Sequence, residues 1–325
     1  MTDRGFADPT VTVVIAAWNA ETTIMRAVDS ALAQSVPVEV IVVDDCSTDA
    51  TAAIVAQAAA RDPRLTLLRQ DRNGGPSSAR NRAIAESGAP WITVLDSDDW
   101  MEPERLALLV ELAESRNADF AADDLWKVDE GAPASERRAM LGGVSGTQAL
   151  GPAEFVLSNL STGHGGRREM GFLKPLMSRR FLERRGLGYD TRIRLGEDYV
   201  LYANALLDGA RFLLTGPAGY VATVRRSSLS GRHPTEAHAH LAAADRAMLA
   251  RPGLSSDVRH AIEAHLLEQR RKLAWRRLID AKGAADPIAA ARCFWAPPKV
   301  CLDLIGRLTT EFLSRLRRRT GMGKA

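Results

Sequence analysis

The chain has 325 residues, of which 46% are hydrophobic and 26% are charged, so it can bury a large core. This composition excludes a disordered or fibrous protein. Lys and Arg number 43 against 40 acidic residues, and a formal net charge of +3 gives no reason to expect a nucleic-acid binder. Three scattered cysteines are too few for a disulfide framework or a zinc site, which fits a reducing cytoplasm.

The N-terminal residues contain two acids and no apolar segment, so we expect no signal peptide. No apolar run approaches the ~20 residues that a membrane-spanning helix needs. The sequence therefore predicts a cytoplasmic protein that is soluble or lies on a membrane surface.

The first 120 residues alternate between apolar runs typical of buried strands and helical patterns. We expect Ser47 to cap the second helix. Four strand–helix repeats in series predict an α/β fold with a doubly wound, mostly parallel sheet. In chain order the predicted strands are 11–17, 38–43, 65–68 and 91–95, and the predicted helices are 21–34, 48–61, 77–86 and 102–115.

The remainder of the chain falls into two parts. Residues 123–171 are rich in Gly, Pro and Ser and have only weak hydrophobic periodicity. Long loops of this kind often cover or bind a substrate. One helix is predicted within this segment, at 152–159. Strand patterns return at 211–214 and 220–224. Beyond Pro234 the pattern is helical, with breaks at 252–253, 283, 287 and 297–298.

Acidic and polar residues follow three of the predicted strands where each strand ends. They lie at 17–19 (Ala-Trp-Asn), 44–49 (Asp-Asp-Cys-Ser-Thr-Asp) and 96–99 (Asp-Ser-Asp-Asp). Ligands of open α/β sheets bind at this edge. Helix capping explains Ser47 and Asp49 equally well. However, three carboxylates within 96–99 repel one another unless a counter-charge is present. Mg²⁺ or Mn²⁺, held by such carboxylates and by substrate phosphates, supplies it, so a metal–diphosphate site is predicted.

Two glycines and a proline, at 74–76, precede the third predicted helix. Glycine lets the backbone approach a ligand, and a helix start favours anions, so this loop is a candidate phosphate site. Arg80, one turn into the helix, is placed to hydrogen-bond a phosphate or a base. Most Gly–Pro helix starts are only turns. The chain lacks the Gly-Lys-Ser/Thr and G-x-G-x-x-G patterns of P-loop and dinucleotide enzymes at the expected positions.

Five segments in this order resemble the family 2 glycosyltransferases of the GT-A fold. They cover residues 10 to about 230 and leave the C-terminal third unexplained. The segments are 11–19 (VTVVIAAWN), 40–49 (VIVVDDCSTD), 73–81 (NGGPSSARN), 94–99 (VLDSDD) and 194–199 (RLGEDY). The resemblance implies a Rossmann-like nucleotide-binding half and a helical C-terminal extension. We expect a catalytic domain over 1–232, divided into a nucleotide-sugar half at 1–122 and an acceptor half at 123–232, with the extension at 233–325.

The resemblance also implies roles for the matching positions in the nucleotide half. Asp44 would contact the uracil, with Ala17 and Asn19 lining the nucleotide pocket. Arg80 would lie against the nucleotide, and Asp96 would hold the ribose or support the metal site.

Three further carboxylates receive catalytic roles from the resemblance. Asp98 would coordinate the Mn²⁺ or Mg²⁺ on the diphosphate, Asp198 would be the general base, and Glu197 would neighbour it near acceptor or sugar. Two adjacent carboxylates raise one pKa of the pair, which suits a base that takes the proton of a sugar hydroxyl. One base opposite the leaving group gives single displacement with inversion. A solvated helix start is the alternative interpretation of Glu197 and Asp198.

Downstream loops supply weaker candidates. After the last predicted strand, Arg232 and His233 would close over the diphosphate, with His233 as a second metal ligand, as the resemblance implies. Lys174, within 172–175, is a candidate for the acceptor site or diphosphate loop, although core packing explains this segment at least as well.

The C-terminal tail combines positive charge with an apolar stripe. Residues 299–325 carry seven basic and two acidic side chains. A basic amphipathic helix of this kind predicts binding to an anionic membrane surface, whereas packing on the catalytic domain is the alternative. Membrane binding suits a polyprenyl-diphosphate-linked oligosaccharide acceptor, as in the succinoglycan-type exopolysaccharide glucosyltransferases that the chain most resembles. The stripe is formed by Cys301, Leu304, Ile305, Leu308, Phe312 and Leu316.

These features together predict an inverting, metal-dependent transferase that uses a UDP-sugar, UDP-glucose in particular. Processive synthases of the family have a Gln-x-x-Arg-Trp motif, whereas here Trp275 lies two positions late after Gln269, so we expect single addition. Two alternatives stay open. A sugar nucleotidyltransferase would need a glycine-rich basic loop after the first strand, which 18–21 lack. A non-catalytic nucleotide-sugar-binding scaffold would bind the donor without turnover.

Overall fold

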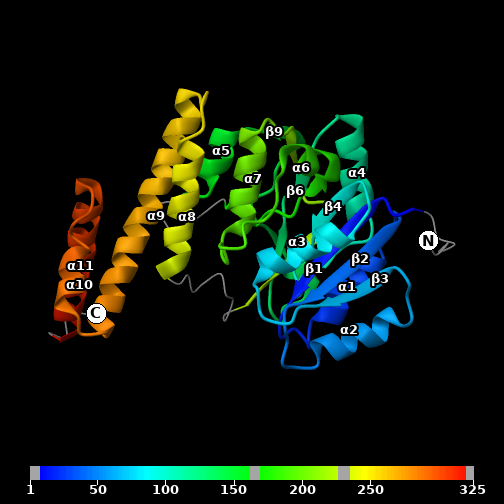
Figure 1. Ribbon diagram of the computed structural model, residues 1–325, viewed down its shortest axis with the longest axis horizontal. Coiled ribbons are helices and arrows are strands. Elements are labelled where there is room, and N and C mark those ends of the chain that lie inside the picture. Colours follow the sequence, from blue (N-terminus) through cyan, green and yellow to red (C-terminus); the bar gives the residue numbers. More distant parts are fainter. Residues whose placement is uncertain (1–7, 162–168, 226–234, 320–325) are drawn as a thin grey trace. The chain divides into compact units, whose positions relative to one another are not determined.

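The structure is a computed structural model that describes residues 8–161, 169–225 and 235–319 (Figure 1). The chain divides into two compact units, residues 1–231 and residues 232–325. Each unit is described by itself below.

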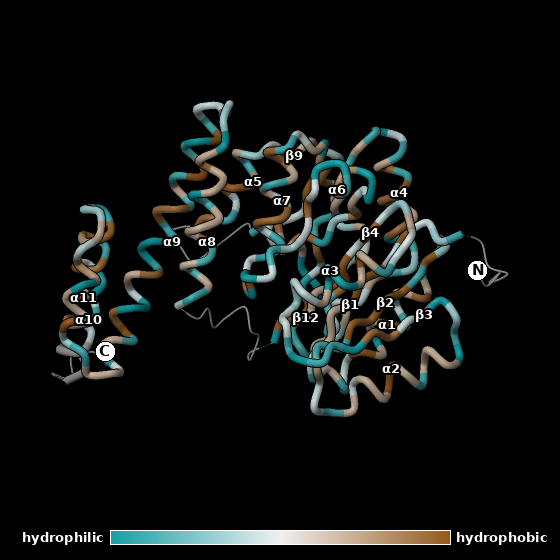
Figure 2. The backbone as a smooth tube through the Cα atoms, in the orientation of Figure 1, coloured by the Kyte–Doolittle hydropathy of each residue, from teal (hydrophilic) through white to brown (hydrophobic). Residues whose placement is uncertain are grey.

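An eight-stranded sheet forms the centre of the larger unit, with the strand order β3-β2-β1-β4-β10-β6-β11-β9. Its first four strands along the chain run parallel to one another. The prediction of these strands is confirmed, and most apolar residues of β1, β2 and β4 are buried, as expected for strands covered on both faces. In the edge strand β3 only Leu65 is buried. Figure 2 gives the hydropathy along the backbone of these elements. They are β1 (Val11–Ala17), β2 (Val38–Asp44), β3 (Leu65–Arg69) and β4 (Trp91–Val94).

The second half of this sheet is mixed rather than parallel. β10 pairs antiparallel with both β4 and β6, β11 runs parallel to β6, and β9 closes the edge antiparallel to β11. Because β10 joins the two halves, it brings the segment just before it next to the end of β4. The bounds are β6 (Phe120–Asp123), β9 (Thr147–Leu150), β10 (Leu176–Ser178) and β11 (Phe212–Thr215).

Four helices connect or flank the parallel strands: α1 (Ile24–Leu32), α2 (Thr51–Ala59), α3 (Pro76–Glu86) and α4 (Arg105–Ser115). Their existence is confirmed, but α1, α2 and α4 begin three residues later than predicted. Ser47 is not the cap of α2, since the N-cap residue is Ala50 and no side chain caps it. The hydroxyl of Ser47 instead accepts a hydrogen bond from the backbone N–H of Asn19, because residues 44–49 hold the loop after β1.

The middle of the chain is more regular than its composition suggested. Short strands from this region pair with partners far along the sequence, which leaves no local periodicity to detect. A four-stranded sheet has the order β5-β12-β7-β8. Its strands are β5 (Trp100–Met101), β7 (Trp126–Asp129), β8 (Arg138–Ala139) and β12 (Tyr220–Val224).

The described part of this unit also contains three α-helices: α5 (Pro152–Ser158), α6 (Arg179–Arg185) and α7 (Glu197–Leu207). α7 is almost fully buried and begins directly after Gly196, whose φ of +82° is a left-handed conformation that glycine adopts readily. This sharp entry places the Glu197-Asp198 pair on the first turn of a buried helix. The pair is therefore not part of a solvated helix start.

The smaller unit is helical, as predicted. It contains α8 (Thr235–Leu249), α9 (Ser256–Gly283), α10 (Pro287–Arg292) and α11 (Pro298–Arg319). α8 and α9 pack together, and a small apolar cluster of Ala274, Val300 and Leu304 joins α9 to α11. Among the described residues, no helix has both the length and the apolar character needed to cross a bilayer.

Candidate active site

Five charged side chains from distant parts of the chain meet at the carboxyl edge of the parallel strands. Arg80 of α3 donates hydrogen bonds to Glu197 (2.8 Å), Asp198 (3.0 Å) and Asp96 (2.9 Å). Lys174, just before β10, contacts Asp198 at 2.7 Å and Asp96 at 3.0 Å. The structure thus brings the predicted base, its neighbour and the first Asp of 96–99 into one cluster.

Within this cluster, Asp96 and Asp198 are bridged twice. Arg80 joins their Oδ1 atoms and Lys174 joins their Oδ2 atoms. Arg80, Lys174 and Asp198 are buried, while the side chain of Asp96 is 34% exposed. Two cations against three carboxylates leave one negative charge, so removing either cation would leave buried carboxylates poorly compensated. The double bridge fixes Asp198 relative to the end of β4.

The cluster shifts the pKa values of its members in opposite directions. Burial alone would lower the pKa of Lys174, but the charges of Asp198 and Asp96 outweigh burial and raise it above its ordinary value. Burial would raise the pKa of Asp96, but Lys174 and Arg80 lower it. Burial raises the pKa of Glu197 by more than the charge of Arg80 lowers it. The pKa of Glu197, the neighbour of the predicted base, is therefore raised.

The other two carboxylates of the segment 96–99 have different surroundings. Asp99 is buried, accepts a hydrogen bond from the Tyr220 hydroxyl (2.9 Å) and another from the backbone of Thr223 (2.8 Å), and so holds β12. The side chain of Asp98 is 35% exposed, with Arg225 Nε 3.6 Å from its Oδ2. Burial and the charge of Asp96 raise the pKa of Asp98. Of the two acids, Asp98 is therefore the one available to a ligand.

The donor set fits a hard divalent cation that is held mainly by substrate phosphates. Asp98 offers a carboxylate that is open to solvent and destabilised by its like-charged neighbour, which a cation would relieve. Within residues 8–161, 169–225 and 235–319, no three His, Cys, Asp or Glu side chains group as metal ligands. The predicted candidates Arg232 and His233 lie outside the described residues.

The nucleotide-side candidates lie together at the ends of β1 and β2, whose register pairs Ala17 with Asp44. Asn19 has φ +50° and accepts a hydrogen bond from the backbone of Thr48 through its side-chain oxygen (2.9 Å). The Asp44 side chain is fully buried and faces the Ser47 N–H at 3.3 Å. These contacts order the two loops against each other beside the charged cluster.

The glycine loop has a different function from the one expected of it. The backbone N–H groups of Gly74 and Gly75 donate to the two carboxylate oxygens of Asp45, at 2.7 and 2.8 Å. Because these amides already have an anionic partner, the expectation that they cradle a phosphate is wrong. The Asp45 carboxylate instead fixes the start of α3, and with it Arg80.

A buried network behind the cluster was not found from the sequence. Arg105, fully buried at the first turn of α4, donates to Asp123 (2.8 Å) and to the backbone carbonyl of Lys174. Asp123 accepts from the backbone N–H of Tyr220, and the Tyr220 hydroxyl accepts from the Asp96 N–H (3.1 Å). The network therefore positions both Lys174 and Asp96. A single Arg after a Glu-Pro-Glu segment carries no signal of this function.

The parallel sheet, the mixed second half and acids at the carboxyl edge define a GT-A glycosyltransferase fold. Residues 12–166 match the family model described as Glycosyl transferase family 2. The succinoglycan biosynthesis protein ExoU of Rhizobium meliloti (strain 1021) is 43% identical over 312 residues, which are 96% of this chain and 90% of ExoU. The chain belongs to glycosyltransferase family 2 and is a hexosyltransferase.

Other relatives and solved structures agree with this assignment. The succinoglycan biosynthesis protein ExoO of the same organism is 41% identical over 256 residues, 78% of this chain and 72% of ExoO. The crystal structure of S. aureus TarS 1–349 in complex with UDP-GlcNAc has a TM-score of 0.64 at 17% identity, covering 87% of this chain and 90% of that one. The mannosyltransferase PcManGT from Pyrobaculum calidifontis, in complex with GDP-Man and Mn²⁺, has a TM-score of 0.55 at 20% identity, covering 94% and 88%.

Proposed function

We propose that this enzyme transfers glucose, with inversion, from UDP-glucose to a hydroxyl of a growing oligosaccharide in exopolysaccharide biosynthesis. The observation that carries the proposal is the cluster in which Asp198 is bridged to Asp96 by Arg80 and Lys174. In this cluster Asp198, the base of our proposal, shares both cations with Asp96, which follows β4. The names of ExoU and ExoO, both succinoglycan biosynthesis proteins, support the pathway class.

In this proposal Asp198 takes the proton of the attacking acceptor hydroxyl. Each of its oxygens already accepts one hydrogen bond, from Arg80 or from Lys174, and each has a second lone pair. When Asp198 becomes neutral, both cations keep a carboxylate partner, because Arg80 also contacts Glu197 and both contact Asp96. The cluster can therefore absorb the proton without leaving a buried cation unpaired.

The leaving group is the nucleoside diphosphate, whose charge grows as the bond to the anomeric carbon breaks. Asp98 would hold a Mn²⁺ or Mg²⁺ ion, which would neutralise this charge when bound. TarS bound to UDP-GlcNAc and PcManGT bound to GDP-Man and Mn²⁺ support a nucleotide-sugar site of this type. Ala17, Asn19 and Asp44, ordered at the ends of β1 and β2, are assigned to the nucleotide.

The acceptor in this proposal is a polyprenyl-diphosphate-linked oligosaccharide, reached at the inner, cytoplasmic face of the bacterial membrane. The basic, apolar tail of the chain supports a peripheral attachment to this surface. Lys174, a candidate for the acceptor site or diphosphate loop from the sequence, is assigned here to the charged cluster because it contacts Asp96 and Asp198. Arg232 and His233 stay assigned to the loop that contacts the diphosphate.

A donor screen tests the proposal. The full chain is incubated with UDP-, GDP- and dTDP-sugars and Mn²⁺, Mg²⁺ or EDTA, and release of the nucleotide is measured. We expect UDP-glucose to be hydrolysed fastest and EDTA to abolish release. Activity with GDP- or dTDP-sugars alone would contradict the role of Asp44, and full activity in EDTA would contradict the role of Asp98. Donor binding with no turnover under any condition would favour a scaffold.

A further inference from the structure

The two units differ sharply in charge. Residues 232–325 contain 18 basic and nine acidic side chains, a formal net charge of +9, whereas residues 1–231 sum to −6. The smaller unit is therefore the part of the chain that an anionic surface would attract.

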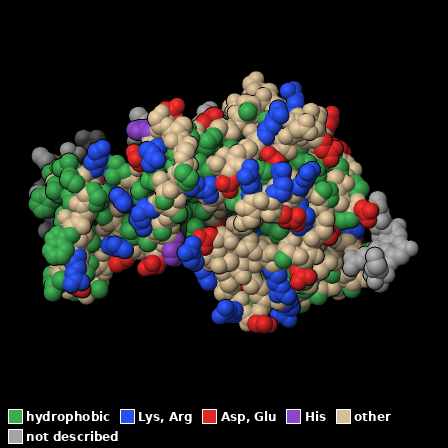
Figure 3. All heavy atoms as spheres, turned by 45° about the horizontal axis from the view of Figure 1, so that its top comes forward, with side chains coloured by type: hydrophobic (Ala, Val, Ile, Leu, Met, Phe, Trp, Pro, Cys, Tyr) green, Lys and Arg blue, Asp and Glu red, His purple; other side chains and the backbone are tan. Residues whose placement is uncertain are grey.

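The outward face of α11 in this unit is apolar. Val300 and Leu304 pack inward on α9, but Leu302 and Phe312 are 69% and 65% exposed. Trp295, just before α11, is 89% exposed. Figure 3 shows apolar side chains gathered over α10 and α11. An exposed apolar group of this extent marks an interaction site. The face also includes Ile288, Ile305, Leu308 and Leu313.

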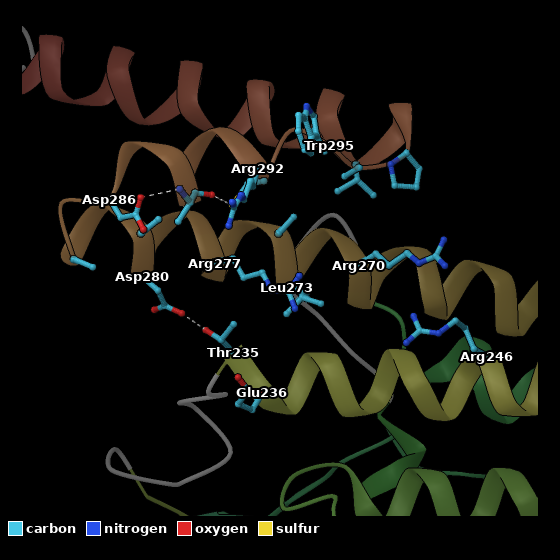
Figure 4. A pocket seen from close by; sticks show the side chains of 18 residues that line it. Thr235, Glu236, Arg246, Arg270, Leu273, Arg277, Asp280, Asp286, Arg292 and Trp295 are labelled. Atoms are coloured by element: carbon cyan, nitrogen blue, oxygen red, sulfur yellow. Dashed lines mark hydrogen bonds between the residues drawn. The ribbon is translucent and has the colours of Figure 1, made fainter.

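A cavity of about 810 Å³ opens beside Trp295, between α8, α9, α10 and the start of α11 (Figure 4). Four arginines line it, and none of them has an ion-pair partner among the residues that the structure describes. Of its three acids, Asp280 accepts from the Thr235 hydroxyl and Asp286 caps α10, which leaves Glu236 as the third. The cavity therefore offers guanidinium groups to an anion. The arginines are Arg246, Arg270, Arg277 and Arg292.

We propose that the smaller unit docks on an anionic phospholipid bilayer through this surface. Trp295 and the apolar face of α11 enter the interfacial layer, and the arginines of the cavity bind lipid phosphates. Charge favours an anionic bilayer over a symmetric pairing of two smaller units, since that pairing would set +9 against +9. The inference deepens the proposed function, on which it rests for the lipid-linked acceptor, and it names the residues that make the attachment.

Flotation of the full chain with vesicles tests the proposal. We expect co-flotation with phosphatidylcholine mixed with phosphatidylglycerol, and little with phosphatidylcholine alone. A basic side chain near such a surface contributes about fivefold, so changing Arg270, Arg277 and Arg292 together to Gln should weaken partitioning about 100-fold. The pair Leu302→Ser and Phe312→Ser should weaken it at least about tenfold.

Exposed residues of the larger unit provide matched controls. Arg116→Gln and Leu108→Ser remove an arginine and an apolar side chain of comparable exposure from the end of α4 and from α4 itself, and should leave flotation unchanged. Thermal melting verifies that each variant is folded. Brominated lipids should quench the fluorescence of the wild type more than that of the variant Trp295→Phe.

Several results would overturn the proposal. Equal flotation of the arginine variant and its control would show that the arginines of the cavity do not contribute to membrane binding. Calorimetric binding of inorganic phosphate without flotation would indicate a site for free phosphate, and a doubled mass that the apolar pair abolishes would indicate a second copy. Donor hydrolysis separates this inference from the proposed function: failed flotation with intact hydrolysis refutes docking alone, and intact flotation without hydrolysis of UDP-glucose counts against the proposed donor alone.

Discussion

Replacing Lys174 by Met tests the double bridge between Asp96 and Asp198. The variant keeps the length of the side chain but removes its charge, so the cluster keeps one cation against three carboxylates. Lys174 is buried and contacts both Asp96 and Asp198 within 3.0 Å. Breaking a buried ion pair on one side costs about 3–5 kcal/mol, and we expect a loss of this order in the free energy of unfolding.

The loss should depend on pH in a direction that the pKa shifts determine. The folded pKa of Lys174 is raised, so its stabilisation is fully present below the ordinary pKa of lysine and is lost only in strongly alkaline solution. The lowered pKa of Asp96 adds stability that is present at neutral pH and is lost as pH falls through the folded pKa. Because Lys174 is the main cause of that lowering, the deficit of the variant should shrink under acidic conditions.

Urea unfolding of the wild type and of Lys174→Met from about pH 7 down to about pH 3 measures this deficit, because the stability that Asp96 contributes is lost only below the ordinary pKa of an aspartate, about 3.9. Lys127→Met is the matched control, because burial lowers the pKa of Lys127 and its charge is not stabilised by the fold. That variant should be neutral or slightly stabilised. A deficit for Lys174→Met that is no larger than that of the control would refute the bridging role.

Three other variants test parts of the site. Arg105→Met should lower the free energy of unfolding, measured by urea unfolding, by about 3–5 kcal/mol, because Asp123 is left buried without its cation. A loss below about 1 kcal/mol would contradict the role of Arg105 in the buried network. Asp45→Ala removes two charged hydrogen bonds and should lower the free energy of unfolding by about 3 kcal/mol. Hydrogen exchange at the amides of Gly74 and Gly75 should become faster, and unchanged exchange would refute the role of Asp45 in holding this loop. Gly75→Ala should cost about 1–3 kcal/mol, because φ +83° with ψ 170° is a conformation essentially restricted to glycine, whereas an unchanged melting temperature would contradict that strain.

The parallel half of the sheet could be predicted from the sequence because its strands are continuous apolar runs with helices between them. In the mixed half only β11 is recognisable as an apolar run, since β6, β9 and β10 have four residues or fewer and pair with strands far along the sequence. Some helices begin later in the structure than the sequence predicts, because polar residues that resemble N-caps bind a neighbouring loop instead, as Ser47 does.

The acids of the site were recognisable because each follows a strand or opens a helix in a distinctive segment. Their partners were not. Lys174 lies in a segment that reads equally well as core, and Arg105 is a buried arginine whose partner Asp123 ends a strand that was not predicted. Glycines were recognised at 74–75, but their ligand is the carboxylate of Asp45, a choice that only tertiary contacts decide.

The glucose-transfer activity of the Asp198→Asn variant tests most directly the central claim, which is that Asp198 is the general base. Transfer of glucose from UDP-glucose to an acceptor and binding of the donor are measured on the same preparation, so that intact binding reports a folded site. A general base contributes about 10²–10⁴-fold, and the account predicts a loss of transfer in this range with donor affinity retained. Transfer at the wild-type rate would contradict the assignment of Asp198 as the base.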